Sequence, residues 1–341
     1  MSKVLECIYA YLYRNNYMGR CGGGDNVYTL TEGLELAEMD ALDSVMRYKG
    51  TVELEKIDMD RGVVRHSASR PKVDDQIVSF SYYPAASKRH SAVCRHSYRQ
   101  SLHGLSVRGH KELVHALLFE EIPAGDYAVD YTDSPILEEH GEIPLDGSAQ
   151  VAGDAVCEVR PEKLKPHTIE DFAYLSHPLS LSDIRALPGP PLLTLAETVH
   201  AILTAKRSGR PMCFLYDPAD WAVAREFLRA ALKLFPAKLS NKLSLVTCYG
   251  SEKGPAVVDV CGIPTCDDEY ISSLKQMSCA VQLSPGGTGV TGIGGEKGPF
   301  AAFLASATDF EFETWLSKTE AYFASVESFE GMDEAALLFM N

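Results

Sequence analysis

Residues 211–249 read PMCFLYDPADWAVAREFLRAALKLFPAKLSNKLSLVTCY, and this stretch decides the fold class. The run from Met212 to Tyr216 is short and apolar, as in a buried strand, and Asp217-Pro218 supplies an N-cap and a proline at the first helical position. Residues 243–249 read as a second strand. Between them, apolar residues recur at helical spacing on one face: Trp221, Ala224, Phe227, Leu228, Ala231, Leu232 and Phe235. The stretch therefore predicts a strand, a helix and a strand with no phosphate-binding loop.

The sequence around this unit continues the alternation. Thr194 to Glu197 form a capping box that opens a helix ending near Gly209. A helix, a strand, a helix and a strand in this order predict a parallel strand pair with a crossover connection. We expect later strands at 256–260 and 279–283 and a mainly helical end from Phe300 to Phe329.

The first half of the chain is predicted to be rich in strands. Tyrosines alternate with apolar residues from Ile8 to Tyr13, a glycine-rich turn follows, and Val27–Leu30 resumes the strand pattern. Apolar residues from Leu36 to Met46 keep helical spacing. Further strands are predicted at 62–66, 76–83 and 91–96. The segment 112–119 is too short for its apolar pattern to distinguish a strand from a helix.

Six prolines between residues 160 and 193 predict an irregular connection between two domains. We therefore expect a β-rich mixed domain over 1–160, a proline-rich connection over 161–193, and a smaller α/β domain over 194–341. The predicted fold class is mixed α/β.

The composition is that of a soluble globular protein. Of 341 residues, 45% are hydrophobic and 23% are charged, and no apolar run approaches the ~18 residues of a membrane span. The first residues do not resemble a signal peptide, so a cytoplasmic protein without membrane contact is expected. The nine cysteines are scattered and predict buried, reduced thiols. Their spacing does not favour zinc, and we expect neither a metal nor a cofactor.

Charge is unevenly distributed. The net charge of −15 makes nucleic-acid binding unlikely to be the function. Residues 76–111 nevertheless contain no Asp or Glu but six Lys and Arg, which leaves −21 on the rest of the chain. These cations either pair with acidic groups of the same chain or receive an anionic partner.

Five histidines lie in or near this segment: His90, His96, His103, His110 and His115. Their spacing does not match a zinc helix, and hydrogen-bonded or exposed histidines are the ordinary interpretation. The alternative is a hydrolase-like enzyme in which Cys94 or His115 acts as the catalytic residue.

A second alternative is a small-ligand or nucleotide binder at the glycine-rich loop 286–298. Residues 287–292 match the pattern G-x-G-x-x-G after a predicted strand. The following residues read as loop, however, whereas a dinucleotide-binding turn opens directly into a helix. A flexible loop is therefore the preferred interpretation.

Several motifs are similar to those of a known family. They are the tyrosine-rich strand and glycine-rich loop at 9–24, Thr31–Leu34, Phe80–Tyr83, Arg108–Leu117 and Leu234–Thr247. In these the chain resembles the N-terminal domain, second type, of the bacterial GTPase-associated protein family, which occurs in NTPase-centred conflict and signalling systems. It departs from the pattern at His110, where Asn is typical, and at Leu245, where an aromatic residue is.

The resemblance implies a non-catalytic adaptor or sensor that binds a GTPase or another NTPase-system protein. Combined with the charge pattern, it predicts a basic contact segment. The residues of this predicted contact segment are Arg95, Arg99, Arg108, His110 and His115.

Overall fold

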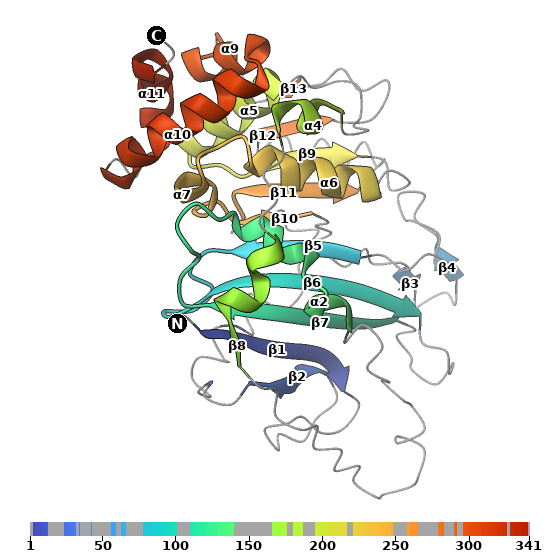
Figure 1. Cartoon of the computed structure of the whole chain (residues 1–341). Coiled ribbons are helices and arrows are strands. Elements are labelled where there is room, and N and C mark those ends of the chain that lie inside the picture. The colour runs from blue at the N-terminus through green and yellow to red at the C-terminus, as the bar shows by residue number, and fades with distance from the viewer. Residues whose placement is uncertain are drawn as a thin grey trace, which may run out of the picture. The chain divides into compact units, whose positions relative to one another are not determined.

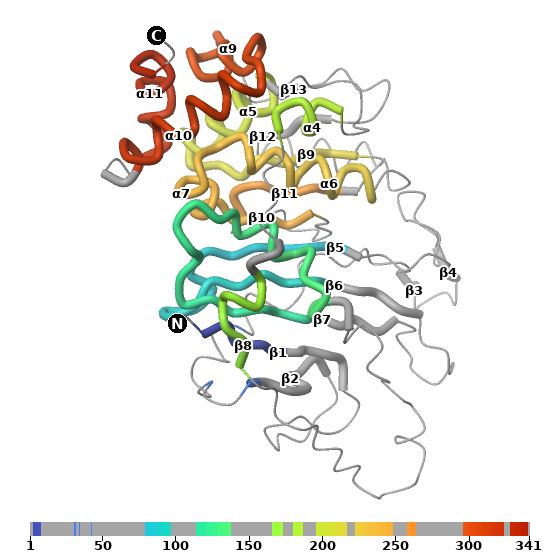
Figure 2. Tube along the Cα trace, viewed as in Figure 1, coloured from blue at the N-terminus to red at the C-terminus, as the bar shows by residue number. Residues whose placement is uncertain are grey.

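Figures 1 and 2 show the structure, which is a computed structural model. The structure describes residues 3–12, 24–31, 34, 42, 56–58, 63–65, 78–100, 110–139, 166–175, 180–186, 195–216, 221–247, 258–264, 279–282, 290–291, 296–325 and 328–339. The fold is mixed α/β, as the sequence predicts.

The chain forms two compact units. Unit 1 comprises residues 1–48, 73–122 and 128–176, and unit 2 comprises 49–72, 123–127 and 177–341. The chain thus passes between the units several times, whereas the sequence suggested one connection. Residues 161–176 go with unit 1 and 177–193 with unit 2.

Unit 1 is built on an antiparallel sheet. Its strands lie in the order β5 (Val78–Tyr83), β6 (Ser91–Gln100), β7 (His110–Phe119), β1 (Lys3–Leu12) and β2 (Gly24–Leu30), and β8 (His167–Thr168) also pairs with β1. The ambiguous segment 112–119 is therefore a strand. All six residues from Val114 to Phe119 are buried, so both faces of β7 are covered and the alternation of polar and apolar residues is lost. For this reason its sequence pattern could not distinguish the period of a strand from that of a helix.

Short helices cover one face of this sheet, as Figure 1 shows for α2 (Ile136–Glu139). The helices η1 (Ala128–Asp133) and η3 (Ile169–Leu175) bring Tyr131 and Phe172 against Phe119 of β7. The ring centroid of Phe119 lies 4.7 Å from that of Tyr131 and 6.2 Å from that of Phe172. This aromatic cluster stabilises the packing of the helices on the sheet through apolar burial and edge-on ring contacts.

Unit 2 contains a mainly parallel sheet. Its strands lie in the order β10 (Leu245–Val246), β11 (Val260–Pro264), β9 (Met212–Tyr216), β12 (Cys279–Gln282) and β13 (Val290–Thr291), and only the pairing of β13 with β12 is antiparallel. The predicted strands at 212–216 and 243–249 do run parallel, but they are not a pair. The strand β11 lies between them, because Val260 and Cys261 pair with both neighbours.

Helix α6 (Trp221–Leu232) connects β9 to β10 and packs closely on β11. The closest approach is at Gly262. A Cβ atom there would lie 2.5 Å from Leu228 Cδ1 and 2.5 Å from the Thr247 carbonyl oxygen. Only glycine fits without displacing the helix or the neighbouring strand.

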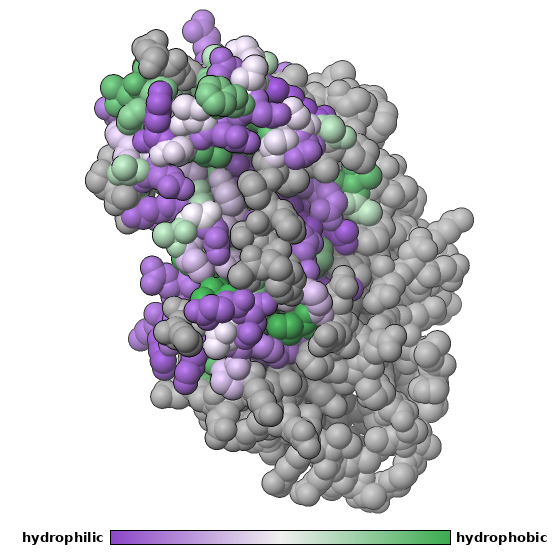
Figure 3. All heavy atoms as spheres, viewed as in Figure 1, coloured by the Kyte–Doolittle hydropathy of each residue, from purple (hydrophilic) through white to green (hydrophobic). Residues whose placement is uncertain are grey.

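The remaining helices of unit 2 are α4 (Leu181–Ala186), α5 (Leu195–Arg207), α7 (Ala237–Ser240), α9 (Pro299–Ser306), α10 (Asp309–Ser325) and α11 (Gly331–Phe339). The predicted helical end is confirmed. Trp315 is buried among Phe300 and Phe312. The apolar side chains Leu337 and Leu338 of α11 are exposed. On the face drawn in Figure 3, the coloured residues are mainly hydrophilic, with hydrophobic ones scattered among them.

Two expectations about secondary structure were wrong. The proline-rich segment contains β8, η3 and α4 among its described residues, so it is not simply an irregular connection. The strand predicted at 256–260 begins only at Val260. Of the helix predicted at 36–46, only Leu42 is described, in helical conformation and fully buried; the rest lies outside the described residues.

Candidate functional site

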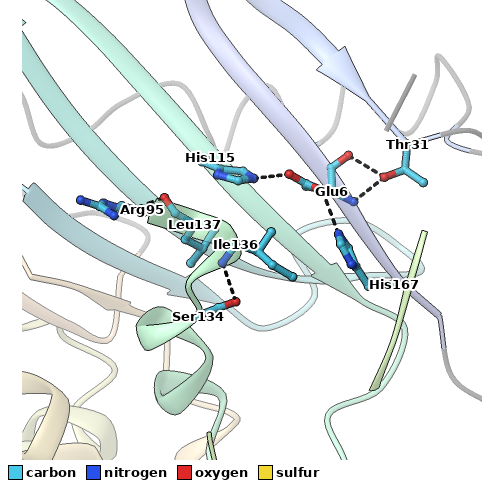
Figure 4. A network of polar contacts seen from close by, with 8 residues as sticks. All are labelled: Glu6, Thr31, Arg95, His115, Ser134, Ile136, Leu137 and His167. Atoms are coloured by element: carbon cyan, nitrogen blue, oxygen red, sulfur yellow. Dashed lines mark hydrogen bonds and ion pairs between the residues drawn. The ribbon is translucent and has the colours of Figure 1, made fainter. Parts of the chain in front are cut away.

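A buried carboxylate shared by two imidazoles is the most distinctive polar group of unit 1 (Figure 4). Glu6 Oε1 lies 2.7 Å from His115 Nε2, and Glu6 Oε2 lies 3.0 Å from His167 Nε2. The side chains of Glu6 and His115 are 3% and 2% exposed, whereas that of His167 is 26% exposed. We call these three residues the carboxylate–imidazole cluster.

Strand pairing explains how the carboxylate–imidazole cluster forms. His115 of β7 lies opposite Ile8 of β1, and Glu6 precedes Ile8 by two residues, so both side chains project from the same face. His167 reaches this face because β8 pairs with the beginning of β1, opposite Val4. Residues more than a hundred positions apart in sequence thus meet at one carboxylate.

Thr31 fixes the backbone at the centre of this cluster. Its hydroxyl accepts a hydrogen bond from Glu6 N at 2.8 Å and donates to Glu6 O at 3.0 Å. Thr31 N also donates to Glu6 O at 2.8 Å. These backbone hydrogen bonds fix the position of Glu6, and its carboxylate then contacts the two imidazoles. Such partners matter because a buried charge is costly unless it is paired and hydrogen-bonded.

Cys94 and His115 lie on opposite faces of the sheet. In the pairing of β6 with β7, Cys94 lies opposite Ala116 and Arg95 lies opposite His115. Successive side chains of a strand point to opposite faces. A cysteine nucleophile at Cys94 therefore does not have His115 as its base.

Cys94 is also in an environment that opposes thiolate formation. It is fully buried, and burial raises the pKa of its thiol to about 12. Reactive cysteines have lowered pKa values and solvent access. This geometry gives no support to the interpretation of Cys94 as a nucleophile.

The face that carries Cys94 holds a second polar pair. Ser81 Oγ and His96 Nε2 are 2.8 Å apart, and burial lowers the pKa of His96 to about 4. The cysteines with described side chains, namely Cys7, Cys94, Cys213 and Cys261, are buried and free, as the sequence predicts for them. His90, His96 and His115 are buried too, and the imidazoles of His96 and His115 are hydrogen-bonded.

Two of the predicted contact residues, His115 and Arg95, make contacts within unit 1. His115 is buried in the carboxylate–imidazole cluster and presents no surface to a partner, which corrects its assignment as a contact residue. Arg95 is part-buried and donates from Nη1 to the Leu137 carbonyl oxygen at 3.3 Å, so its guanidinium holds α2 against β6. The side chains of Arg99 and His110, and the whole of Arg108, lie outside the described residues.

The backbone places Arg99 and His110 at one end of the hairpin formed by β6 and β7. Arg99 lies directly opposite Lys111, and Gln100 lies opposite His110. Arg108 is two residues before His110 in sequence. The register therefore places Arg99, Lys111 and His110 at this hairpin end.

The glycine-rich loop does not have the local structure of a dinucleotide-binding turn. Val290 and Thr291, inside the G-x-G-x-x-G match, form β13 and pair antiparallel with β12. A dinucleotide-binding turn leads instead from a strand into a helix. The match thus lies in a strand connection, and the flexible-loop interpretation is wrong for these two residues as well.

The N-terminus of α9, the helix that follows this loop, is in contact with a carboxylate of the same chain. Asp333 Oδ1 accepts from Phe300 N at 3.2 Å at the beginning of α9, and Asp333 Oδ2 lies 2.6 Å from Arg207 Nη2. A Cβ atom at Gly298 would lie 2.5 Å from Asp333 Oδ1. The position that a phosphate takes at a helix N-terminus is therefore filled by a carboxylate of the chain itself.

Among the residues that the structure describes, no three His, Cys, Asp or Glu side chains are arranged to hold a metal ion. Within the same residues, no helix is both long and apolar enough to cross a membrane.

Comparison with known proteins found no family model and no curated protein that match this sequence.

Neither Glu6 nor His167 is among the site residues predicted from the sequence. Glu6 is an acidic residue inside a strand whose other central residues are apolar, and this is the signal that could have identified it. His167 lies in the proline-rich segment, where no strand was expected, so its pairing with β1 could not be inferred.

Proposed function

We propose that this protein is a non-catalytic adaptor or sensor of a bacterial GTPase- or other NTPase-centred conflict or signalling system. It binds an acidic surface of a protein partner through the end of the β6–β7 hairpin. The proposal rests on the sequence resemblance described above and on one structural observation, the direct opposition of Arg99 and Lys111.

Like charges directly opposite each other destabilise an antiparallel pair. Arg99 and Lys111 thus impose a cost on the free protein, and an acidic group placed between them removes it. The nearest cations in the same acid-free segment have other roles, because Arg89 pairs with Glu120 at 3.5 Å and Arg95 holds Leu137. Of the six cations of the segment, Arg99 and Lys111 are the two that the described register places directly opposite each other.

The alternatives have less support. A hydrolase requires a nucleophile and a base within hydrogen-bond reach, whereas Cys94 and His115 project from opposite faces. A nucleotide site at 286–298 requires a helix N-terminus open to phosphate, whereas Asp333 fills that of α9.

The proposal predicts that an NTPase is encoded near the gene of this protein, and the test uses the full chain and that purified NTPase. Binding is measured by biolayer interferometry at low and high salt, for the wild type, for Arg99→Glu/Lys111→Glu, and for the control Lys238→Glu/Lys318→Glu. The control makes the same charge change at exposed lysines of unit 2. We expect the hairpin variant to weaken binding by at least about tenfold and the control to bind as the wild type does.

High salt should weaken wild-type binding, since the contact is charged and exposed. Equal affinity of the hairpin variant and the control, or no binding by the wild type, would remove the proposal. A second variant, Arg108→Glu, tests whether the connection between the strands takes part.

A further inference from the structure

We propose that Cys213 and Cys261 are an oxidation site, at which hydrogen peroxide forms a reversible disulfide bond that joins β9 to β11 and stabilises unit 2. This inference does not depend on the proposed partner. It rests on the register of two neighbouring strands and on the distance between two sulfur atoms.

The strands β9 and β11 are neighbours in the parallel sheet (Figure 1). Their register places Cys261 directly beside Cys213. Neighbouring strands are about 4.8 Å apart, which lies within the range of Cα separations found across disulfide bonds. Cys261 Sγ lies 3.4 Å from Cys213 Sγ. A bonded distance of about 2 Å therefore requires an approach of only about 1.4 Å.

The cysteine pair lies on the face of the sheet opposite α6. Gly262 follows Cys261 in sequence and approaches Leu228 of α6, and successive side chains of a strand point to opposite faces. Cys261 therefore projects away from α6. Cys213 projects to the same face as Cys261 because the two are in register. The bond can thus close while the contact of α6 with β11 stays intact.

Cys7 and Cys94 of unit 1 provide a comparison. Both are buried and free, and each lies opposite Ala116 of β7, Cys7 on β1 and Cys94 on β6. A whole strand separates them, so their Cα atoms are roughly 10 Å apart, beyond the limit of about 7 Å for a disulfide bond. Among the four cysteines whose side chains are described, the geometry selects Cys213 and Cys261.

Burial determines when the pair reacts. Both side chains are fully buried, and burial raises the pKa of the Cys261 thiol, with a further rise caused by Cys213. The thiolate is the reactive form, and it is rare at pH 7 while the sheet is closed. Hydrogen peroxide therefore reacts after a local opening of the sheet has exposed one of the two thiols.

The oxidation has two steps. The exposed thiolate attacks one oxygen of hydrogen peroxide, the O–O bond breaks, and a sulfenic acid forms while the other oxygen leaves as hydroxide and takes up a proton to become water. When the sheet closes, the second sulfur attacks the sulfenic sulfur. The S–S bond forms, the S–OH bond breaks, and the hydroxyl group leaves as water with the proton of the second thiol. The two thiols lose two electrons, which the peroxide gains, and the strand register supplies the proximity for the second step.

The experiment treats the folded full chain with hydrogen peroxide at pH 7, without urea and with urea below the unfolding transition. Remaining thiols are alkylated, and the protein is digested without reduction for mass spectrometry. We expect a peptide linked through Cys213 and Cys261, about 2 Da lighter than the sum of its reduced parts, which dithiothreitol separates. Urea should accelerate its formation several-fold, because opening limits the reaction.

Matched variants distinguish this pair from the other cysteines. Cys213→Ala and Cys261→Ala should each abolish the linked peptide, whereas the controls Cys7→Ala and Cys94→Ala should keep it. Oxidation of the wild type should raise the urea midpoint of unfolding by roughly 1 M, because the bond restricts the unfolded chain between residues 48 positions apart. Cys213→Ala should show no such shift.

Four results would each overturn the proposal. They are links from Cys213 or Cys261 mainly to other cysteines, sulfinic acid without a link, no reaction even in urea, and an unchanged urea midpoint once the link has formed. The peptide map of the wild type needs no substitution, so it decides the matter where an alanine variant does not fold.

Discussion

At the scale of single residues, burial decides what each polar side chain does. Cys94 and His96 are two positions apart on one strand and both are buried. Burial raises the pKa of the thiol and lowers that of the imidazole, so both are neutral at pH 7. Neutral partners in a core stabilise the fold through packing and hydrogen bonds and are poor candidates for catalysis.

His96 gives a prediction about pH. Its folded pKa, about 4, lies below the ordinary value of 6.5, so the unfolded chain takes up the proton first as the pH falls. The contribution of His96 to the free energy of unfolding is therefore intact at pH 7. It declines between pH 6.5 and 4 by a total on the order of 3 kcal/mol.

His96→Gln should remove this part of the acid dependence, so that the stability difference from wild type shrinks as the pH falls. Urea unfolding at neutral and acidic pH measures it. Ser81→Ala is the matched control, because it deletes the hydrogen bond to His96 and leaves the titrating group. An unchanged acid dependence in His96→Gln would show that His96 is not the group concerned.

At the scale of elements, the residues of the candidate site lie mainly on strands, whereas polar contacts near helix ends join the helices of unit 2 to one another. Successive residues of β6 contribute to different structures, since Cys94 belongs to one face and Arg95 to the other. The helix α4 is joined to α10 through Ser182, which donates from N and Oγ to Asp309 at 2.7 and 2.6 Å. Arg185 of α4 donates to the carbonyl oxygens of Leu304 and Ala307 at the end of α9.

The hairpin end provides a prediction about stability that is separate from partner binding. Arg99→Glu alone should stabilise the free protein by roughly 0.5 kcal/mol, because it places a carboxylate opposite Lys111. Lys111→Glu should do the same, and the double variant should lose the gain. A double-mutant cycle by urea unfolding measures the coupling. A coupling of zero would mean that the two side chains do not interact.

The connection between α4 and α10 predicts a second acid effect. Hydrogen bonds from Ser182 hold the pKa of Asp309 below its ordinary value. A carboxyl with a lowered folded pKa contributes stability above its unfolded pKa of about 3.8, and the contribution is lost as the pH falls through the folded value.

Asp309→Asn should therefore lower the thermal midpoint at pH 7 and have no effect at about pH 2. Differential scanning calorimetry at both values measures it, with Glu313→Gln, exposed on the same helix, as the control. A deficit of equal size at both pH values would assign the effect to packing instead of charge.

At the scale of the whole molecule, the sequence predicts local patterns better than long-range partners. The buried strand at 212–216 and the helices after Phe300 carry strong local signals, and both were found. That β11 lies between β9 and β10, or that β8 adds to β1, depends on contacts between distant residues. No spacing rule contains this information.

The same limit applies to the candidate site. Cys94 and His115 were selected because they are reactive residue types in one stretch of sequence. In the structure they project from opposite faces of the sheet, because successive side chains of a strand alternate between faces. His115 instead shares the carboxylate of Glu6 with His167, which comes from another segment. The acid-free stretch 76–111 includes Arg99 and Lys111, which the register places opposite each other, and its role as a contact segment stays a prediction.

The contact of Asp333 with the beginning of α9 has a practical consequence for fragments of this protein. Asp333 belongs to α11, so α11 supplies the counter-ion of a helix that begins more than thirty residues earlier. A shortened chain that stops before residue 331 would leave Phe300 N, Arg207 and the positive end of α9 facing solvent. Phosphate bound by such a fragment would be a property created by the truncation.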